Sequence, residues 1–241
     1  MIEKRKADIA GGHHWLPLVG ALFVTCLIVS NIIAVKVASI GILTFPAAVI
    51  FFPVSYILGD VLTEVYGYAR ARQIIWTGFF CNILAVIAIW LSIELPASFF
   101  WTAGSYATAE ASQRAYEALF GFTPRILAAS FVAYLFGEFL NAFVLARMKI
   151  ATGGRHLWMR TIGSTLVGQM ADSTIFIILA FSGTLPMVLI GQMVVTQWLL
   201  KSGYEALMTP LTYAAVGFLK QAEQEDHYDI DTNFNPLLWR Q

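Results

Sequence analysis

The sequence predicts an all-α integral membrane protein, a bundle of six transmembrane helices with an interfacial or re-entrant helix between the third and fourth spans. Three observations predict it. First, 58% of the 241 residues are hydrophobic and 12% are charged, about half the charged fraction of a soluble domain. Second, the mean hydropathy is +0.69, and six apolar runs are each long enough to cross a bilayer. Third, lysine and arginine gather in alternate connecting segments. The chain reads as one transmembrane domain over 1–241, with short tails at 1–15 and 220–241.

The six candidate spans follow one another with short polar connections. A helix needs about 20 apolar residues to cross the hydrocarbon core. The N-terminal run is expected to be an uncleaved span, because it is too long for a signal-peptide core and has no small-residue cleavage site. The candidates are Leu16–Val37, Ile42–Leu62, Ile74–Ile93, Arg125–Met148, Thr161–Ser182 and Pro186–Leu219.

The last run is too long for one simple crossing. It fits one long, tilted or kinked helix, or a helix pair broken near Gly203 or Pro210. One crossing with an extension agrees better with the charge distribution described below.

The segment Leu95–Pro124 is neither a clean span nor a clean loop. It begins with an aromatic cluster of the kind found at the level of lipid headgroups. Alanines then recur every four residues from Ala103 to Ala115, which is a helical period with a weakly apolar face. This segment is therefore expected to form the interfacial or re-entrant helix.

The basic residues fix the expected orientation. Eleven of the 15 lysines and arginines lie in the tails or after the second and fourth spans, whereas only Arg114 and Arg125 lie in the opposite connections. The positive-inside rule then places both termini in the cytoplasm, which requires an even number of crossings. The tail after Leu219 is acidic and is expected to be loosely structured.

Several classes of function lack their signature. The formal net charge is +0, so no overall field attracts nucleic acid. The two cysteines lie in apolar runs and indicate buried free thiols, and the four histidines fall in loops or tails, where solvated side chains are expected. The chain carries no P-loop and no GxSxG or HExxH motif, so neither a cofactor nor an enzymatic activity is expected.

The stretch Pro53–Arg72 carries two carboxylates, Asp60 and Glu64, on one helix face. Like charges at this spacing repel, and a bare carboxylate near a membrane is costly. Either these acids lie at the water boundary and pair with Arg70 and Arg72, or they act directly in transport. The candidates for gating or ion coupling are Asp60, Glu64, Glu205 and Lys36.

Polar side chains inside the spans give the candidate substrate site. Three share one face of the fourth span at i, i+4 and i+7, two lie three residues apart in the fifth, and a lysine and a glutamate lie four apart in the sixth. Such residues either bond helices together or mark a ligand or ion pathway. Carboxylates, amides and aromatic rings suit a flat polar heterocycle. The candidate residues are Glu138, Asp172, Asn141, Gln169, Lys201, Tyr134, Asn31 and Trp198.

Five runs resemble the queuosine precursor transporter family, also called the vitamin uptake transporter family. The resemblance covers about Ser30 to Tyr213; one departure is Ala69–Arg70, where members often carry two consecutive basic residues. The runs are SNIIAVKV (Ser30–Val37), GDVLTEVYGYARAR (Gly59–Arg72), GEFLNAFVLARMK (Gly137–Lys149), RTIGSTLVGQMADS (Arg160–Ser173) and KSGYEALMTPLTY (Lys201–Tyr213).

The resemblance implies a multi-pass protein of the bacterial inner membrane that imports deazaguanine precursors of the tRNA base queuosine, such as 7-cyano-7-deazaguanine. The expected site lies between the first, fourth, fifth and sixth spans, with Glu138 and Asp172 as principal anchors. The alternative is a substrate-binding subunit of an energy-coupling-factor importer, whose ATPase would be another protein. The expected partners are the substrate and the bilayer, and the sequence leaves open whether the chain forms a homodimer.

Overall fold

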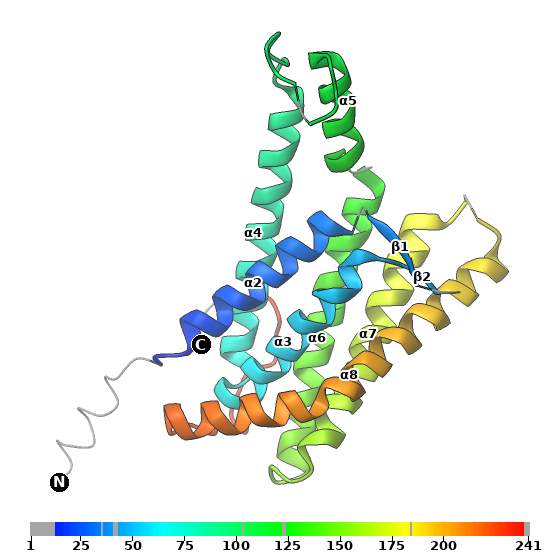
Figure 1. Ribbon diagram of the computed structural model, residues 1–241. Helices are drawn as coiled ribbons and strands as arrows, with labels where there is room; N and C mark the ends of the chain where they lie inside the picture. Colours follow the sequence, from blue (N-terminus) through cyan, green and yellow to red (C-terminus); the bar gives the residue numbers. More distant parts are fainter. Residues whose placement is uncertain are drawn as a thin grey trace.

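The computed structural model describes residues 13–34, 36–40, 43–102, 104–121, 124–183 and 185–238. This part of the chain contains seven α-helices, one short 3-10 helix and one two-stranded hairpin (Figure 1). The elements are α2 (Leu16–Ile33), β1 (Val37–Ile40), β2 (Leu43–Pro46), η2 (Ala47–Ile50), α3 (Phe52–Tyr66), α4 (Tyr68–Glu94), α5 (Ala109–Phe120), α6 (Pro124–Ala151), α7 (Leu157–Phe181) and α8 (Met187–Glu223).

Four helices have the length and composition of membrane spans, namely α2, α4, α6 and α7. Large apolar side chains on these helices point outward; Leu84 and Trp90 of α4 are 67% and 57% exposed. In water such a surface would be unfavourable, whereas lipid accommodates it. The expectation of a helical membrane protein is confirmed at this level.

The ends of six helices meet at one end of the molecule in alternating direction. Glu64 near the C-terminal end of α3 bonds Arg160 in the first turn of α7, and Lys149 near the C-terminal end of α6 contacts both Glu64 and the tail after α8. The backbone N–H of Trp15, just before α2, donates to Glu223 at the end of α8. The chain therefore runs up and down through α2, α3, α4, α6, α7 and α8.

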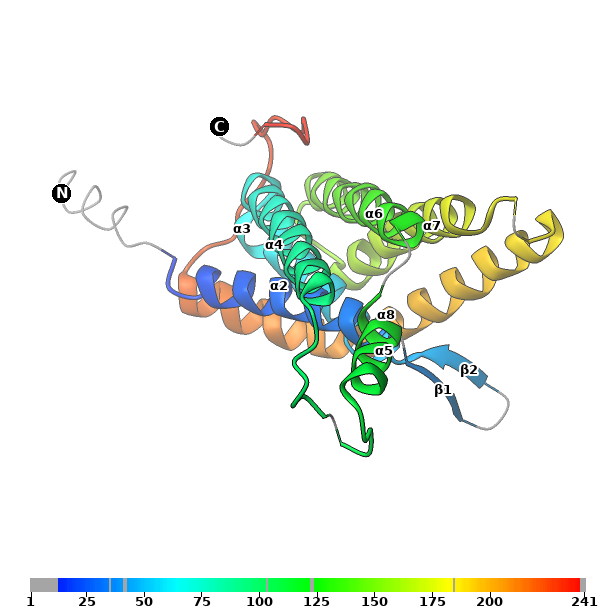
Figure 2. The same ribbon diagram turned by 90° about the horizontal axis from the view of Figure 1, so that it is seen from above.

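Helices α6 and α7 pack side by side along much of their length (Figures 1 and 2). Glycine allows their close approach at two positions. A Cβ atom on Gly137 would lie 2.8 Å from Cβ of Asp172, and one on Gly168 would lie 2.8 Å from Cβ of Asn141. Small residues at a helix crossing let backbones come near each other inside a membrane, and here they bring polar side chains of both helices together.

The predicted start of the second span is wrong. Residues 43–46 pair with 37–40 as an antiparallel hairpin instead of beginning a helix at Ile42, so the described chain is not purely α-helical. The physical reason is proline: Pro46 lacks an N–H and disfavours the helical conformation of Phe45. Pro53, by contrast, lies in the first turn of α3, where its missing N–H is harmless.

The last run forms one continuous helix in this structure. α8 has 37 residues and contains Pro210 in its interior. Its length corresponds to about 55 Å, well beyond the hydrocarbon thickness of about 30 Å. The run is therefore one long helix and not a helix pair broken near Gly203 or Pro210.

A helix lies between α4 and α6, as expected, but this helix, α5, begins at Ala109, so the predicted helical period is realised only in its second half. Thr108 caps its N-terminus by accepting a hydrogen bond from the N–H of Ala111. Gln113 donates to the carbonyl of Ile93, and Tyr116 shares a hydrogen bond with Ser92. These contacts hold α5 beside the far end of α4 (Figure 1).

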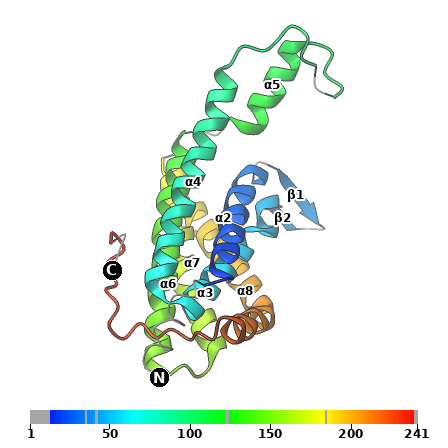
Figure 3. The same cartoon turned by 90° about the vertical axis from the view of Figure 1, so that its left-hand side faces the viewer.

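The expectation of a loosely structured acidic tail is wrong for residues 224–238. This segment runs from the end of α8 across the ends of the helices (Figure 3). Asp229 is buried and accepts from the backbone N–H of Tyr68, and Arg72 donates to the carbonyls of Asn233 and Asn235. The tail docks because it supplies acceptors to the N-terminal turns of α4, whose first N–H groups lack helical partners.

Two smaller expectations also change. His13 is not simply solvated, because its ring pairs with Glu225 at 2.7 Å and contacts Arg70. Cys26 and Cys81 are free, as expected, but half-buried.

Candidate functional site

Buried charges at the end of the molecule where the six helices meet form a closed network around one carboxylate. Glu64 is fully buried. Arg160 binds it through two nitrogens, Nη2 to Oε1 at 2.8 Å and Nε to Oε2 at 3.2 Å, and Lys220 Nζ lies 2.7 Å from Oε1. A bidentate arginine is among the strongest partners for a carboxylate.

Asp226 of the tail completes this network. Lys149 Nζ donates to Asp226 at 2.6 Å and to the carbonyl of Glu64 at 2.6 Å, and Lys220 lies 2.8 Å from Asp226. Burial opposes ionisation of Asp226, but the hydrogen bonds from the two lysines outweigh it and lower the pKa of this carboxyl below its usual value. We call Glu64, Lys149, Arg160, Lys220 and Asp226 the ionic cluster.

The expectation that Asp60 and Glu64 pair with Arg70 and Arg72 is wrong. Both arginines point to the tail: Arg70 pairs with Glu225 at 3.3 Å, and Arg72 donates to tail carbonyls. The helix ends at Gly67, whose φ is +84°, so the chain turns before it reaches the arginines. The cations of Glu64 come from other helices instead.

A second group of buried polar side chains lies deeper in the bundle. Each is at most 4% exposed, apart from Lys201, whose side chain is 20% exposed. They come from α3, α6, α7 and α8. This group, called here the central cluster, contains Tyr56, Asp60, Glu138, Asn141, Gln169, Asp172, Lys201 and Glu205.

Two hydrogen bonds connect helices within the described part of the central cluster. Lys201 Nζ of α8 donates to Asp172 of α7 at 2.6 Å and lies 4.4 Å from the centre of the Phe52 ring. Asn141 Nδ2 of α6 donates to Asp60 of α3 at 2.7 Å. These contacts are the interhelical bonding that one interpretation of the sequence anticipates.

Most of the remaining acceptors have no partner. Within the described residues, no hydrogen bond reaches Oε1 of Glu138, Oδ2 of Asp60, Oδ1 of Asn141, Oε1 of Gln169 or either carboxylate oxygen of Glu205. The hydroxyl of Tyr56 is also unpaired and buried. A buried polar atom without a partner costs about 1–3 kcal/mol, so bonding between helices does not account for this set.

Three further predicted site residues lie outside the central cluster. Tyr134 is buried beside the cluster, but its hydroxyl donates to the carbonyl of Ile75 at 2.9 Å. Lys36 is exposed between α2 and β1, and Asn31 is half-buried near the end of α2. Helix α3 thus contributes to the cluster through Tyr56 and Asp60, whereas the sequence predicts a contribution from the first span.

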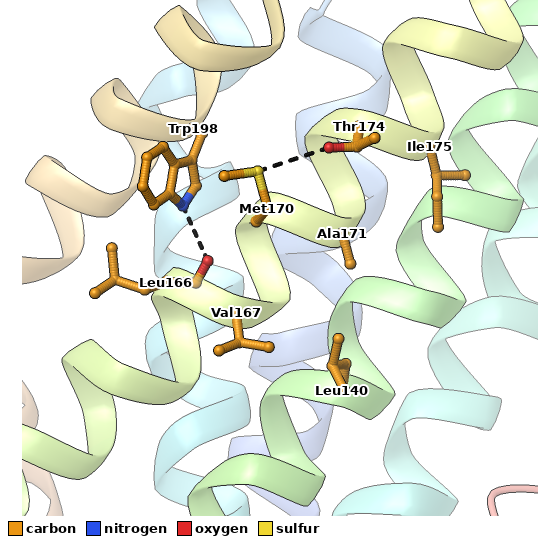
Figure 4. A pocket seen from close by; sticks show the side chains of 8 residues that line it. All are labelled: Leu140, Leu166, Val167, Met170, Ala171, Thr174, Ile175 and Trp198. Carbon is orange, nitrogen blue, oxygen red and sulfur yellow. Dashed lines mark hydrogen bonds between the residues drawn. The ribbon is translucent and has the colours of Figure 1, made fainter.

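Trp198 lines an apolar groove of about 570 Å³ on the opposite face of α7 (Figure 4). Its indole N–H donates to the carbonyl of Leu166 at 2.9 Å. The α7 residues that line the groove lie on one face of the helix, and those of the central cluster lie on the other, as the helical period requires. The groove carries no charged side chain, so we assign the polar chemistry to the central cluster.

Sequence patterns did not identify Tyr56 of the central cluster, nor the residues that join Glu64 in the ionic cluster, which are Lys149, Arg160, Lys220 and Asp226. Tyr56 lies four residues before Asp60 and therefore on the same face of α3, a signal that the spacing carries. Arg160 was counted only as a loop charge, although it is 1% exposed. No local pattern predicts its pairing with Glu64, because the two residues lie 96 positions apart.

Comparison with known proteins decides the family. The family model described as "Putative vitamin uptake transporter" matches residues 46–215, well over half of the chain. The chain belongs to this family of transporters. Its matched region contains every residue of the central cluster and all of the ionic cluster except Lys220 and Asp226.

Two curated relatives support the assignment. The chain is 30% identical over 198 residues to the "Probable queuosine precursor transporter" of Bacillus subtilis (strain 168), covering 81% of this chain and 82% of the relative. It is 28% identical over 171 residues to the "Queuosine precursor transporter" of Escherichia coli (strain K12), covering 69% and 67%. No solved structure matches the chain at a significant level.

Family membership confirms the recognised resemblance and the expectation of a transporter rather than an enzyme. Both relatives are named as transporters and neither as a subunit, which does not favour a substrate-binding subunit of an ATP-driven importer.

Proposed function

We propose that this transporter imports deazaguanine precursors of queuosine, such as 7-cyano-7-deazaguanine, across the bacterial inner membrane for tRNA modification. The names of the two relatives carry the substrate class. Glu138, Asn141 and Gln169 of the central cluster support it chemically, because they offer buried, unpaired acceptors to a flat heterocycle with N–H donors.

Glu138 and Asp172 are the proposed anchors of the substrate. An ionised carboxylate accepts two parallel N–H bonds, as the amine-bearing edge of a deazaguanine supplies. Asn141 and Gln169 lie on the same two helices and are fully buried, and each has an unpaired carbonyl oxygen. Lys201, bonded to Asp172, is placed to donate to a ring carbonyl when that bond opens.

The proposed topology has six crossings with both termini in the cytoplasm. The alternating helix directions support it, and so does the gathering of basic residues at one end. In this arrangement the ionic cluster and the docked tail lie at the cytoplasmic surface, and α5 lies at the opposite interface.

Uptake of labelled 7-cyano-7-deazaguanine by proteoliposomes that contain only this chain tests the function. We expect saturable uptake that unlabelled substrate inhibits and that protein-free liposomes lack. An absolute requirement for an added ATPase module would contradict an independent importer. No uptake under any condition, by protein that is folded before and after reconstitution, would reject the substrate class.

A further inference from the structure

Three carboxylates of the central cluster lack a positive partner. Asp60, Glu138 and Glu205 are each at most 1% exposed. Within the described residues, no lysine or arginine nitrogen lies within 4.0 Å of them; the cations nearby pair with Asp172 or Glu64 instead. A buried carboxylate without a partner is strongly disfavoured as a bare anion.

These buried acids also lie near enough to interact electrostatically across helices. Asp60 on α3 interacts electrostatically with Glu205 of α8, Glu138 of α6 and Glu64 of its own helix. Glu138 interacts in turn with Asp172 of α7 and with Glu205. The only positive charge in the central cluster is that of Lys201, which is 2.6 Å from Asp172. Like charges so arranged cannot all be ionised at once without a compensating ligand.

We propose that Asp60 and Glu205 form a proton-binding pair that couples an inward proton gradient to substrate import. This inference rests on the proposed function and extends it to the driving force. In each transport cycle, one carboxylate of the pair accepts a proton from the outer side and releases the same proton to the cytoplasm.

A proton fits this pair better than a metal ion. No group of three or more histidine, cysteine or acidic side chains in the described ranges is arranged to hold a metal ion. A proton on one carboxyl turns it into an O–H donor, which can satisfy a neighbouring unpaired oxygen. The candidates for that oxygen are Oδ1 of Asn141, Oδ2 of Asp60 and the two carboxylate oxygens of Glu205, none of which has a hydrogen-bond partner within the described residues.

Asn141 connects the pair to the proposed substrate anchors. It lies one turn after Glu138 on α6, and its Nδ2 donates to Asp60. Protonation of Asp60 removes a negative charge facing Glu138, which favours the ionised Glu138 that a deazaguanine would bind. By linkage, bound substrate favours the proton on Asp60 to the same extent.

The test uses proteoliposomes with labelled 7-cyano-7-deazaguanine and an acidic exterior. For one proton per substrate, a gradient of about one pH unit supports accumulation of about tenfold. We expect the wild-type protein to approach this limit and a protonophore to reduce uptake to equilibration. Glu205→Gln and Asp60→Asn should lose accumulation while they retain exchange of internal for external substrate. Glu110→Gln, at an exposed acid of α5, is the matched control and should accumulate substrate normally.

Retained exchange shows that a variant is folded and binds substrate. If either variant fails to fold, a wild-type measurement decides: substrate added outside should make a weakly buffered medium more alkaline. Equilibrating uptake without any response to the gradient would overturn the inference and leave the proposed function intact. Accumulation driven by sodium ions, or unimpaired accumulation in both variants, would overturn it equally. Absence of binding and uptake altogether would reject both.

Discussion

The ionic cluster and the central cluster lie one helical turn apart on α3, at Glu64 and Asp60, yet they treat a buried carboxylate in opposite ways. Glu64 is held by Arg160 and Lys220 and is contacted by Lys149. Asp60 has a single neutral donor, Asn141. The comparison teaches that a buried acid with every oxygen matched belongs to the scaffold, whereas one with open acceptors is prepared for a ligand or a proton.

Removing the buried carboxylate of Glu64 from the ionic cluster should have the largest effect on stability. Glu64→Gln leaves three cations around a neutral amide, and breaking a buried pair costs about 3–5 kcal/mol. We expect a lower folded yield and a clear drop in the melting temperature in detergent. Glu138→Gln is the matched control, since it removes an unpaired carboxylate and should leave stability unchanged or raised. Equal melting temperatures for Glu64→Gln and the wild type would contradict the distinction between the ionic cluster and the central cluster.

The ion pair between Asp172 and Lys201 allows substrate binding to be distinguished from bonding between helices. Asp172→Asn should weaken binding of 7-cyano-7-deazaguanine about 10- to 100-fold, because a hydrogen bond to a charged group contributes about 1.5–3 kcal/mol. The double variant Asp172→Asn/Lys201→Met removes both charges and should recover stability but not affinity. Recovery of affinity in the double variant, measured by titration, would assign the pair to interhelical bonding alone.

A substitution at the close approach of α6 and α7 should have an intermediate effect on uptake. Gly137→Ala places a methyl group 2.8 Å from Cβ of Asp172 and from the hydroxyl of Tyr56. Overpacking of this kind costs about 1–3 kcal/mol, and it should displace Asp172 and reduce uptake. Gly203→Ala on α8 is the control, because its Cβ would meet nothing within 4 Å. Normal uptake by Gly137→Ala would mean that the spacing of these helices does not shape the site.

The smallest effect is expected at the exposed edge of the ionic cluster. The lowered pKa of Asp226 means that its ion pairs stabilise the docked tail above the usual carboxyl pKa, and that this contribution is lost as pH falls through the lowered value. Asp226 is 43% exposed, so we expect less than about 1 kcal/mol.

Amide hydrogen exchange of residues 226–235 measures this loss. Acidification should lower the protection factors of the wild type, which compare the observed exchange rate with the intrinsic rate at the same pH, and Asp226→Asn should show lower protection at neutral pH with a weaker acid response. Identical exchange in the two proteins would show that the two lysine contacts do not hold the tail.

Local sequence features predicted most of the helices and much of the central cluster. Spacing alone placed Glu138 with Asn141 and Lys201 with Glu205, because one helical turn brings such residues together. It could not predict the start of α3, where proline and hairpin pairing override an apolar run. Nor could it predict the partners of Glu64, which lie 85 to 156 positions away and meet it only through tertiary packing. The docked tail was missed for the same reason.

Binding of 7-cyano-7-deazaguanine to the purified protein, with guanine as competitor, tests the central claim most directly. The central cluster is proposed to hold the substrate through Glu138, an acid without a counter-cation. We predict saturable binding by the wild type and at least about tenfold weaker binding by Glu138→Gln, with no loss of thermal stability. Equal affinity in two equally stable proteins would contradict the account and leave the buried acids of the central cluster without their proposed ligand.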